Sequence, residues 1–477
     1  MKIFQKASLF VLFAILLVTI SLKASPASAS PVDVNGGVMN EYEYKELFFL
    51  TGYPIQFSGK AVVTEKENKK TLTRNYRFTL TGPGGEKLTR SVNYTANISD
   101  HEGKGQTTTQ FEVKSYSEKV TIGKDTYTLD DYQYSEGTVS DNLPASSYYS
   151  GNIVGRKIYK HKIAATKKDE LITVHLNGRN MGYKNFWGAT ETQLMDSEII
   201  TPQGYAFVTS KASDSKSRTL QYEPFDPSLS SFTGGHAVIS SADMVSEYTY
   251  NIPFGAGKGT IELQKKNTPK IERLIVPKFR DLDRHNAKDA IQKLYSLGIF
   301  DENSQFFSPN TPMKRYQYTV GILKAVDLRV LEPPKKSKVP RQPIFADLST
   351  KDPDYMYIES AVEQGIITGV TPDSFEPDSP VTRVQAVAIL VRALGMEGRA
   401  PSPGFKTQYA DDHKISGWAK DSVYVATELG LIQGNEMNRF NPQQQLTRAQ
   451  AALITSRFLD FLENDLKQNY RDEIFFQ

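Results

Sequence analysis

Three arginines in the C-terminal part of the chain each follow a similar polar stretch that leads into an apolar run. The stretches are PNTPMKR ending at Arg315, PDSPVTR ending at Arg383 and PQQQLTR ending at Arg448. Apolar residues then recur at helical spacing, so each arginine falls in the first turn of an expected helix. A helix N-terminus offers N–H groups and the positive end of the helix dipole, and a guanidinium can grip a carboxylate with two hydrogen bonds. These residues are therefore chemically suited to binding an anion.

The residues around the arginines predict how these helices begin. Thr382 and Thr447 are good N-caps, and Gln385 and Gln450 follow three residues later, which completes a capping box in each case. The first of the three stretches has Lys314 at the cap position. Since losing a cap costs about 1 kcal/mol, this helix is expected to have the least well closed start.

The three stretches belong to longer repeats, each of which predicts two helices. Every unit opens with an aromatic-x-Asp motif, passes through a first helix that ends at glycine, and reaches a Phe-x-Pro motif before the second helix. The openings are Phe279-Arg280-Asp281, Phe345-Ala346-Asp347 and Tyr409-Ala410-Asp411, and the glycines are Gly298, Gly365 and Gly430. These glycines suit the left-handed residue that closes a helix. One unit cannot bury its apolar stripe alone, so the three must pack together.

Residues 31–276 show a different period, which is typical of strands. The segments 71–82, 87–99, 107–117 and 170–178 alternate apolar or aromatic with polar residues. Such alternation predicts strands with one buried and one solvated face. We therefore expect an all-β, antiparallel, sandwich-like domain. A division into two subdomains near residues 150–170 is the alternative, because the region is long for one sandwich.

The first 29 residues have the features of an export signal. Lys2 and Lys6 precede an apolar run from Ala7 to Leu22, and Ala27-Ser28-Ala29 has the small residues of a cleavage site. The run is shorter than the roughly 20 residues of a membrane-spanning helix. We expect residues 1–29 to be a cleaved signal peptide and the mature protein to be secreted, with no membrane segment; a retained anchor is the alternative.

Composition narrows the functional classes. The chain has 57 Lys and Arg against 54 Asp and Glu, and removal of the leader with Lys2, Lys6 and Lys23 balances them. A net charge near zero gives no general case for binding nucleic acid or an anionic membrane. There are no cysteines, which excludes a disulfide scaffold, a thiol nucleophile and a cysteine metal site. No cofactor or metal is expected.

The repeated features resemble the S-layer homology (SLH) module of bacterial cell-surface proteins. The resemblance covers about residues 278–462 and rests on the aromatic-x-Asp opening, the Gly-Ile or Gly-Leu helix end, Phe-x-Pro, and the Thr-Arg-Ala-Glu-like start of the second helix. It implies an all-α pseudo-threefold bundle. It also implies grooves between neighbouring modules that bind the secondary polysaccharide linked to peptidoglycan in a Gram-positive cell wall. In many members the ligand is a pyruvylated amino sugar.

The resemblance assigns roles to particular residues of this chain. The implied ligand-binding residues are Arg315, Arg383, Arg448, Thr382, Thr447, Asp281, Asp347, Asp411 and Trp418. The arginines would hold the carboxylate of the pyruvate ketal, an aspartate would accept hydrogen bonds from sugar hydroxyls, and the tryptophan would stack on a sugar ring. Structural alternatives are inter-module or surface salt bridges for the arginines, turn capping before the first helix for the aspartates, and a core position for the tryptophan.

Departures from the family pattern rank the three modules. Gln317, Gln385 and Gln450 stand where the family has glutamate, and Lys314 replaces the capping threonine in module 1. The place of Trp418 is held by Asn286 in module 1 and by Pro353 in module 2. We therefore expect module 3 to have the best groove, module 2 the next, and module 1 to be structural.

The expected organisation has a wall anchor at the C-terminus and a displayed β domain. Its parts are a signal peptide (1–29), a β-rich outward domain (31–276), module 1 (277–331), a linker (332–343), module 2 (344–399), module 3 (405–462) and a tail (463–477).

The β region contains no HExxH, GxSxG or phosphate-loop motif. We therefore expect a non-catalytic protein of the cell wall or S-layer, with other surface proteins as a further class of partner. The alternative is an anchored glycan or cell-wall hydrolase with its active site in the β region.

Overall fold

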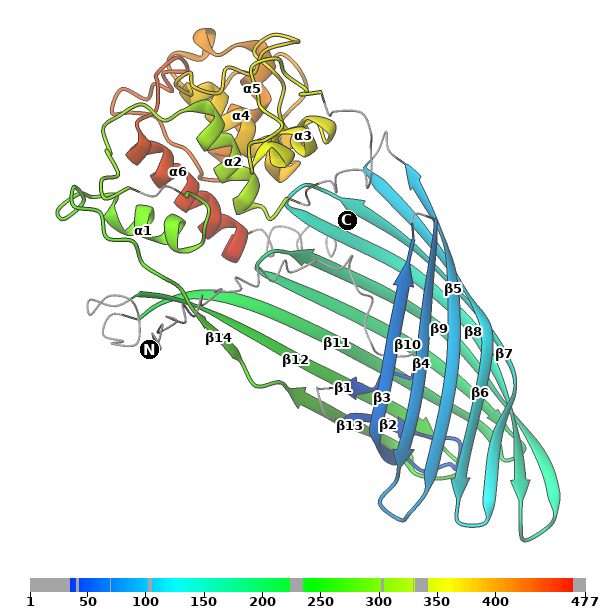
Figure 1. Ribbon diagram of the computed structural model, residues 1–477. Coiled ribbons are helices and arrows are strands. Elements are labelled where there is room, and N and C mark those ends of the chain that lie inside the picture. Colours follow the sequence, from blue (N-terminus) through cyan, green and yellow to red (C-terminus); the bar gives the residue numbers. More distant parts are fainter. Residues whose placement is uncertain are drawn as a thin grey trace, which may run out of the picture.

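The computed structural model describes residues 35–39, 43–68, 70–101, 105–223, 235–301, 304–328, 330 and 342–465. The expected signal peptide, nearly all of the expected linker and most of the tail lie outside these residues. Figure 1 shows a long curled sheet with a helical region packed over one of its ends. The two expected fold classes therefore occupy the two parts of the chain to which the sequence patterns point.

One antiparallel sheet contains the strands of the N-terminal part that the structure describes. They are β1 (Val38–Met39), β2 (Tyr44–Phe48), β3 (Ile55–Glu67), β4 (Thr71–Thr81), β5 (Lys87–His101), β6 (Gln106–Ile122), β7 (Asp125–Asn142), β8 (Ser146–Ile163), β9 (Lys168–Asn185), β10 (Gly188–Thr201), β11 (Gly204–Glu223), β12 (Gly235–Ile252), β13 (Gly257–Lys266) and β14 (Lys270–Arg273). Strands β1 to β13 pair in sequence order, and β14 pairs with β12.

The all-β prediction is confirmed, but the sandwich-like detail is wrong. The strands form one continuous sheet, and β8 pairs with β9 from Ser146 opposite Asn185 to Ile163 opposite Lys168, so the ladder runs unbroken through residues 150–170. Strands as long as β7 to β9 accumulate twist, which curls a wide sheet over its own inner face. The first strand returns to the last ones, where the Met39 N–H lies 2.9 Å from Met244 Sδ. A single curled layer thus encloses the hydrophobic core that two facing layers would enclose in a sandwich.

Alternation along the strands builds the core inside this curl. In β4 the inward residues are Leu72, Arg74, Tyr76, Phe78 and Leu80, all at most 7% exposed, while their neighbours in the strand are more exposed. The apolar inward residues of β4 and its neighbours belong to one hydrophobic cluster that extends as far as β13. Burying each large apolar side chain contributes about 1.5–3 kcal/mol. The strand period alone therefore decides which face encloses the core.

The inner face also holds a buried charge network centred on Arg90. Its guanidinium donates to both carboxylate oxygens of Glu46 at 2.8 Å and to Glu118 Oε2 at 2.8 Å. Tyr44 and Tyr159 donate hydroxyl hydrogen bonds to the same two carboxylates. Burial alone would raise the pKa of Glu118, but the charge of Arg90 lowers it below its ordinary value. The contribution of Glu118 to stability is therefore present above the ordinary carboxyl pKa and is lost as the pH falls through its lowered value.

The C-terminal part is helical, with two helices in each repeat. The first helices are α1 (Lys288–Ser296), α3 (Tyr355–Glu363) and α5 (Gly417–Glu428), and the second are α2 (Arg315–Ala325), α4 (Arg383–Leu394) and α6 (Arg448–Asp460). Short turns η2 (Glu397–Arg399), η3 (Asp412–Lys414) and η4 (Phe461–Asp465) complete it. Apolar side chains from all six helices share one hydrophobic cluster. No helix in the described ranges is long and apolar enough to cross a membrane.

The predicted helix starts and ends are confirmed. Thr382 with Gln385, and Thr447 with Gln450, form complete capping boxes, whereas Lys314 makes no side-chain cap hydrogen bond. The helix-end glycines have the left-handed conformation, with φ of 68° at Gly298, 70° at Gly365 and 69° at Gly430.

The sheet and the helical region touch through the end of the last helix. The Asn185 side chain donates to the Leu462 carbonyl at 3.0 Å, and the Leu220 N–H donates to a carboxylate oxygen of Glu463 at 3.1 Å. Trp187, in the hairpin between β9 and β10, is buried in the hydrophobic cluster of the helical region. The β domain is therefore seated on the helices by polar and apolar contacts in addition to the chain connection.

We predict that Arg90→Ala strongly destabilises the β domain, because it leaves two buried carboxylates without their shared cation. Removing one member of a buried ion pair costs about 3–5 kcal/mol. Urea unfolding at neutral pH, followed by circular dichroism in the β-sheet band, measures the loss. The control is Lys160→Ala, whose ion pair with Asp130 is roughly half exposed (47% and 44%), so a loss below about 1 kcal/mol is expected. Equal losses in the two variants would contradict this account of the network.

Thr382→Ala should lower the free energy of unfolding of the helical region by about 1 kcal/mol, because it removes the cap of α4. The matched control is Lys314→Ala at the same position of α2, where no side-chain cap bond exists. Urea unfolding followed in the helical band compares them. A control as destabilised as Thr382→Ala would show that the cap is not the cause.

Candidate functional site

The starts of the three second helices are joined in a closed ring of main-chain hydrogen bonds. The Met313 N–H donates to the Leu446 carbonyl at 2.8 Å, the Leu446 N–H donates to the Val381 carbonyl at 3.0 Å, and the Val381 N–H donates to the Met313 carbonyl at 2.9 Å. Each of these residues lies two positions before one of the three arginines. The ring therefore brings Arg315, Arg383 and Arg448 into equivalent places around one centre.

The first N–H groups of these helices are used by neighbouring modules. The N–H of Arg315 donates to Ser379, that of Arg383 to Gln444 and that of Arg448 to Thr311, all to main-chain carbonyls at 2.8–2.9 Å. In α4 and α6 the capping threonines take a further N–H. The expectation of free first-turn N–H groups at these helix starts was wrong, because a repeat that packs in a ring satisfies them with its neighbour. The N–H groups of the three arginines are therefore already satisfied by neighbouring modules.

Each arginine side chain crosses into the next module and lies over the phenylalanine of its Phe-x-Pro motif. The guanidinium carbon lies 4.8 Å from the ring centre in the pair Arg315–Phe375, 5.2 Å in Arg383–Phe440 and 4.5 Å in Arg448–Phe307. Burial lowers the pKa of Arg315 and of Arg383, although a guanidinium stays charged at neutral pH. These cation–π contacts join all three modules.

The far end of the guanidinium distinguishes Arg448 from the other two. Arg315 donates from Nη2 to the Thr368 carbonyl at 2.9 Å, and Arg383 donates from Nη2 to the Gln433 carbonyl at 2.6 Å. Arg448 donates from Nε to the Phe307 carbonyl at 2.8 Å. Its two terminal nitrogens instead contact side chains, which are the Gln317 amide oxygen and the Tyr295 hydroxyl, each at 3.3 Å. Side chains can turn away from a guanidinium, whereas main-chain carbonyls in a packed turn cannot.

Two sequence differences explain why only this fork is held by side chains. Tyr295 lies three residues before its helix-end glycine, where module 2 has Val362 and module 3 has Thr427. Gln317 has no threonine to complete a capping box, because Lys314 occupies the cap position. The corresponding glutamines of α4 and α6 are held in their capping boxes. The departure that predicted a weak helix start therefore also leaves Gln317 outside a capping box, with its amide oxygen 3.3 Å from Arg448.

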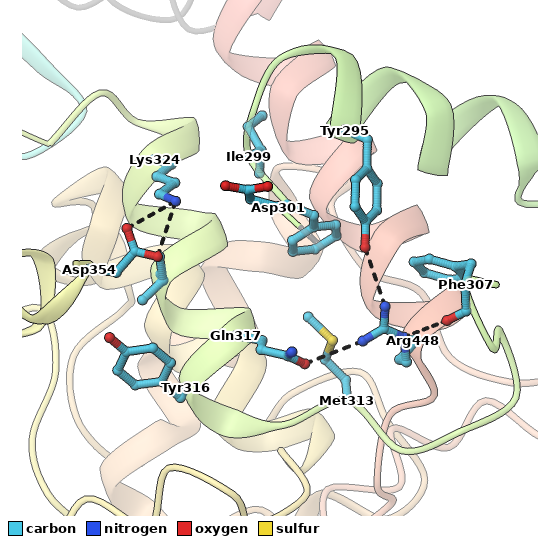
Figure 2. A pocket seen from close by; sticks show the side chains of 12 residues that line it. Tyr295, Ile299, Asp301, Phe307, Met313, Tyr316, Gln317, Lys324, Asp354 and Arg448 are labelled. Carbon is cyan, nitrogen blue, oxygen red and sulfur yellow. Dashed lines mark hydrogen bonds and ion pairs between the residues drawn. The ribbon is translucent and has the colours of Figure 1, made fainter. Parts of the chain in front are cut away.

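A small pocket lies beside Arg448, between modules 1, 2 and 3 (Figure 2). It has a volume of about 70 Å³ and is lined from α1, the loop after it, α2, the residue before α3 and the start of α6. Figure 2 shows the Tyr295 hydroxyl and the Gln317 amide pointing at the guanidinium, and Asp301 lying in the loop above. On the far side, Lys324 Nζ lies 3.1 Å from Asp354. We call this pocket the Arg448 groove.

The three aspartates of the aromatic-x-Asp motifs hold the Phe-x-Pro turns of their own modules. Asp281 accepts the N–H groups of Phe307 and Ser308, and Asp411 accepts those of Phe440 and Asn441, at 2.7–2.9 Å. Asp347 does the same in module 2. The middle residue of each turn has a left-handed φ of 54–58°. The capping alternative is thus correct in kind but wrong in place, since the turn precedes the second helix and not the first.

Backbone hydrogen bonds change the acidity of these carboxyls. Partial burial raises the pKa of Asp281 and Asp347, but the donated N–H groups outweigh it and leave both pKa values below the ordinary range. Both groups are therefore ionised at neutral pH.

Trp418 is exposed, so the core alternative for it is wrong. Its side chain is 53% exposed at the start of α5, and the Arg392 guanidinium lies 5.8 Å from its ring centre. It does not line the Arg448 groove, and neither do Arg315, Arg383, Thr382 or the three aspartates. Of the residues expected to bind ligand, the structure places Arg448 alone on this groove.

Several groove residues were missed by sequence reasoning. Tyr295, Asp301, Lys324 and Asp354 belong to no repeated motif, and Gln317 was noted only as a departure from one; they come together because distant modules meet. The one sequence signal was Lys314 at the cap position of α2, which bears on Gln317 alone. Among the described residues, no group of three or more His, Asp or Glu side chains is arranged to hold a metal ion.

Comparison with known proteins places the repeats in one family. The family model for the S-layer homology domain matches residues 278–319, 344–387 and 408–452. An endoglucanase of Bacillus sp. (strain KSM-635) is 34% identical over 122 residues, which make up 26% of this chain and 12% of that protein. The surface-layer 125 kDa protein of Lysinibacillus sphaericus is 30% identical over 179 residues, or 36% of this chain and 14% of that protein.

An amylopullulanase of Thermoanaerobacterium thermosulfurigenes is 30% identical over 184 residues, or 38% of this chain and 9% of that protein. The chain thus matches between 9% and 14% of the length of these three relatives. Surface-layer proteins and polysaccharide-degrading enzymes share the matched SLH region. The three family matches, the ring that joins them and the surface-layer relatives together identify the chain as a cell-surface protein with three tandem S-layer homology domains in its C-terminal part.

Proposed function

We propose that the SLH modules attach this protein to the cell wall by binding the peptidoglycan-linked secondary polysaccharide in the Arg448 groove. The observation that carries the proposal is the fork of Arg448, whose terminal nitrogens face a pocket and are held by two side chains that can turn aside. The three modules act as a pseudo-threefold bundle, because the ring at Met313, Val381 and Leu446 repeats the same contact three times.

The ligand group that fits the pocket is a carboxylate, such as that of a pyruvate ketal on an amino sugar. A space of about 70 Å³ accepts a small substituent and not a whole sugar ring. The carboxylate replaces Gln317 and the Tyr295 hydroxyl as partners of the guanidinium and forms two charge-assisted hydrogen bonds. Because Arg448 is only 8% exposed, little water competes for these bonds. The ring of Tyr295 then borders the sugar.

The other predicted residues take different parts in this proposal. Arg315 and Arg383 act as clamps between modules, since their forks are bonded to main-chain carbonyls. The aspartates keep the Phe-x-Pro turns in shape below the groove. Trp418 remains a candidate for stacking on a sugar ring, because its ring is exposed. The sequence predicted the best groove in module 3, whereas the groove proposed here lies where module 3 meets module 1.

We propose a non-catalytic role for the β domain, which the anchor displays at the cell surface. Its inner face is filled by a hydrophobic cluster and by paired charges such as the Arg90 network. The alternative function is that of an anchored hydrolase. Endoglucanase, exoglucanase and amylopullulanase relatives show that such an anchor can be joined to an enzyme, although they match this chain only in the SLH region. The two functions differ only in what the sheet does, since both use the same anchor.

Arg448→Lys is predicted to lower the affinity of the full chain for purified cell-wall sacculi about tenfold or more, because lysine keeps the charge but loses the two-pronged grip. Co-sedimentation with sacculi, before and after removal of the secondary polysaccharide with acid, measures it. Arg457→Lys is the matched control, since Arg457 lies on the same helix and is exposed.

Binding that is indifferent to both the polysaccharide and Arg448 would overturn the proposed function. Circular dichroism of each variant separates a lost ligand contact from a lost cation–π clamp on Phe307.

Zymography of the full chain on cell-wall material and common polysaccharides tests the alternative. We expect no cleared zone. A zone that disappears when one carboxylate of the sheet is replaced would establish the hydrolase and contradict the non-catalytic role.

A further inference from the structure

A second cavity adjoins the Arg448 groove on the side of the sheet. It has a volume of about 410 Å³. One wall is made by Arg273, Leu274 and Ile275, at the end of β14 and in the segment that leads to module 1. The other wall includes Tyr295 and Asp301, which also line the Arg448 groove. The two cavities are therefore neighbours that share part of their lining. We call the second one the connector cavity.

Hydrogen bonds to both domains position the walls of the connector cavity. The Leu274 N–H donates to the His236 carbonyl at 2.8 Å, which ties the connector to the first residues of β12. The Gln292 side chain of α1 donates to the Pro277 carbonyl at 3.5 Å. The family match begins at residue 278. One wall of this cavity therefore lies outside the SLH domain and is particular to the way this chain joins its anchor to its β domain.

The lining has the mixture of groups that a sugar ring needs. Ile275 is 75% exposed, so it presents an apolar surface to solvent at the rim of the cavity. The Ser296 hydroxyl, at the end of α1, is buried from water and has no hydrogen-bond partner in the structure. A buried hydroxyl without a partner is uncommon, and a bound water or a ligand group would supply one. The guanidinium of Arg273 and the carboxylate of Asp301 add a donor and an acceptor for hydroxyl groups.

We propose that the connector cavity is a second subsite for the same polysaccharide and takes the sugar residue next to the one whose carboxylate enters the Arg448 groove. This inference rests on the proposed function. The Arg448 groove holds only a small substituent, whereas about 410 Å³ lies within the usual range of sites that enclose a small ligand. Because Tyr295 and Asp301 border both cavities, the second subsite lies next to the first, as it must for two linked sugars. The anchor thus recognises a short oligosaccharide of at least two sugars.

The consequence is a preference for chain length. A terminal monosaccharide reaches the Arg448 groove alone, whereas an oligosaccharide fills both subsites and gains the second without a second association cost. Ile275→Asp puts a charge where the apolar face of the sugar packs. Ser296→Ala removes the unpartnered hydroxyl. Both changes act on the oligosaccharide and leave the monosaccharide's contacts with Arg448 intact.

The test is titration calorimetry with the full secreted chain and two probes. The probes are the terminal monosaccharide and an oligosaccharide of two to three repeats, both prepared from the purified secondary wall polysaccharide. We expect the unmodified chain to bind the oligosaccharide more tightly. Ser296→Ala should weaken oligosaccharide binding about threefold to tenfold, Ile275→Asp should weaken it at least as much, and neither should change monosaccharide binding. Ile271→Asp is the matched control, since Ile271 is 54% exposed on β14 and does not line the cavity.

Every other result of the calorimetry rejects either the second subsite or the proposed function. If the unmodified chain binds both probes equally, or if the two variants bind the oligosaccharide as well as the control does, the connector cavity is not a subsite while the proposed function stands. If the variants lose both probes equally, the loss is structural and the subsite is again rejected. If the unmodified chain binds neither probe, the proposed function fails, and this inference fails with it.

Discussion

The helical region depends on one constraint, which is that no module by itself satisfies all the N–H groups at the start of its second helix. The N–H groups at Met313, Val381 and Leu446, and those of the arginines two residues later, find acceptors only in neighbouring modules. Unpaired main-chain groups in a buried position would cost about as much as a lost hydrogen bond each. The ring must therefore close as a whole. That requirement aligns the three arginines over the three phenylalanines and places loops of separate modules side by side.

The three crossings of the ring have nearly equal contacts, and the proposed function places the binding site at the one that differs most. Lys314 gives up a cap on α2, and Tyr295 replaces the smaller side chains of the other two modules. Both differences fall around Arg448, so one of three similar crossings becomes a groove while the other two remain clamps. Under the proposed function, a small loss of helix stability and one larger aromatic side chain turn one of three packing contacts into a binding site. The repeated ring contacts position the three arginines, and the differences at Lys314 and Tyr295 set the surroundings of Arg448 apart.

The sequence predicted the local features well and the long-range ones poorly. Helix starts at Thr382 and Thr447 and the left-handed glycines depend on residues a few positions apart, so short patterns are enough to find them. The strand period likewise predicted an all-β domain. It could not show whether the strands close as two layers or as one curled sheet, because twist accumulates over the whole sheet. The helix pattern also did not show that the first-turn N–H groups are already hydrogen-bonded. Their acceptors lie more than 60 residues away in the sequence, as Ser379 does from Arg315.

The seat of the sheet on the last helix has a mechanical consequence for a protein held at a surface. Pulling on the sheet loads the bonds from Asn185 to Leu462 and from Leu220 to Glu463, together with the packing of Trp187, in parallel with the peptide connection at residues 274–277. Force is shared between two routes that reach the anchor at different modules. A force applied to the sheet by flow at the cell surface would therefore turn the sheet and the helical region together. It would not swing the sheet about a single flexible joint.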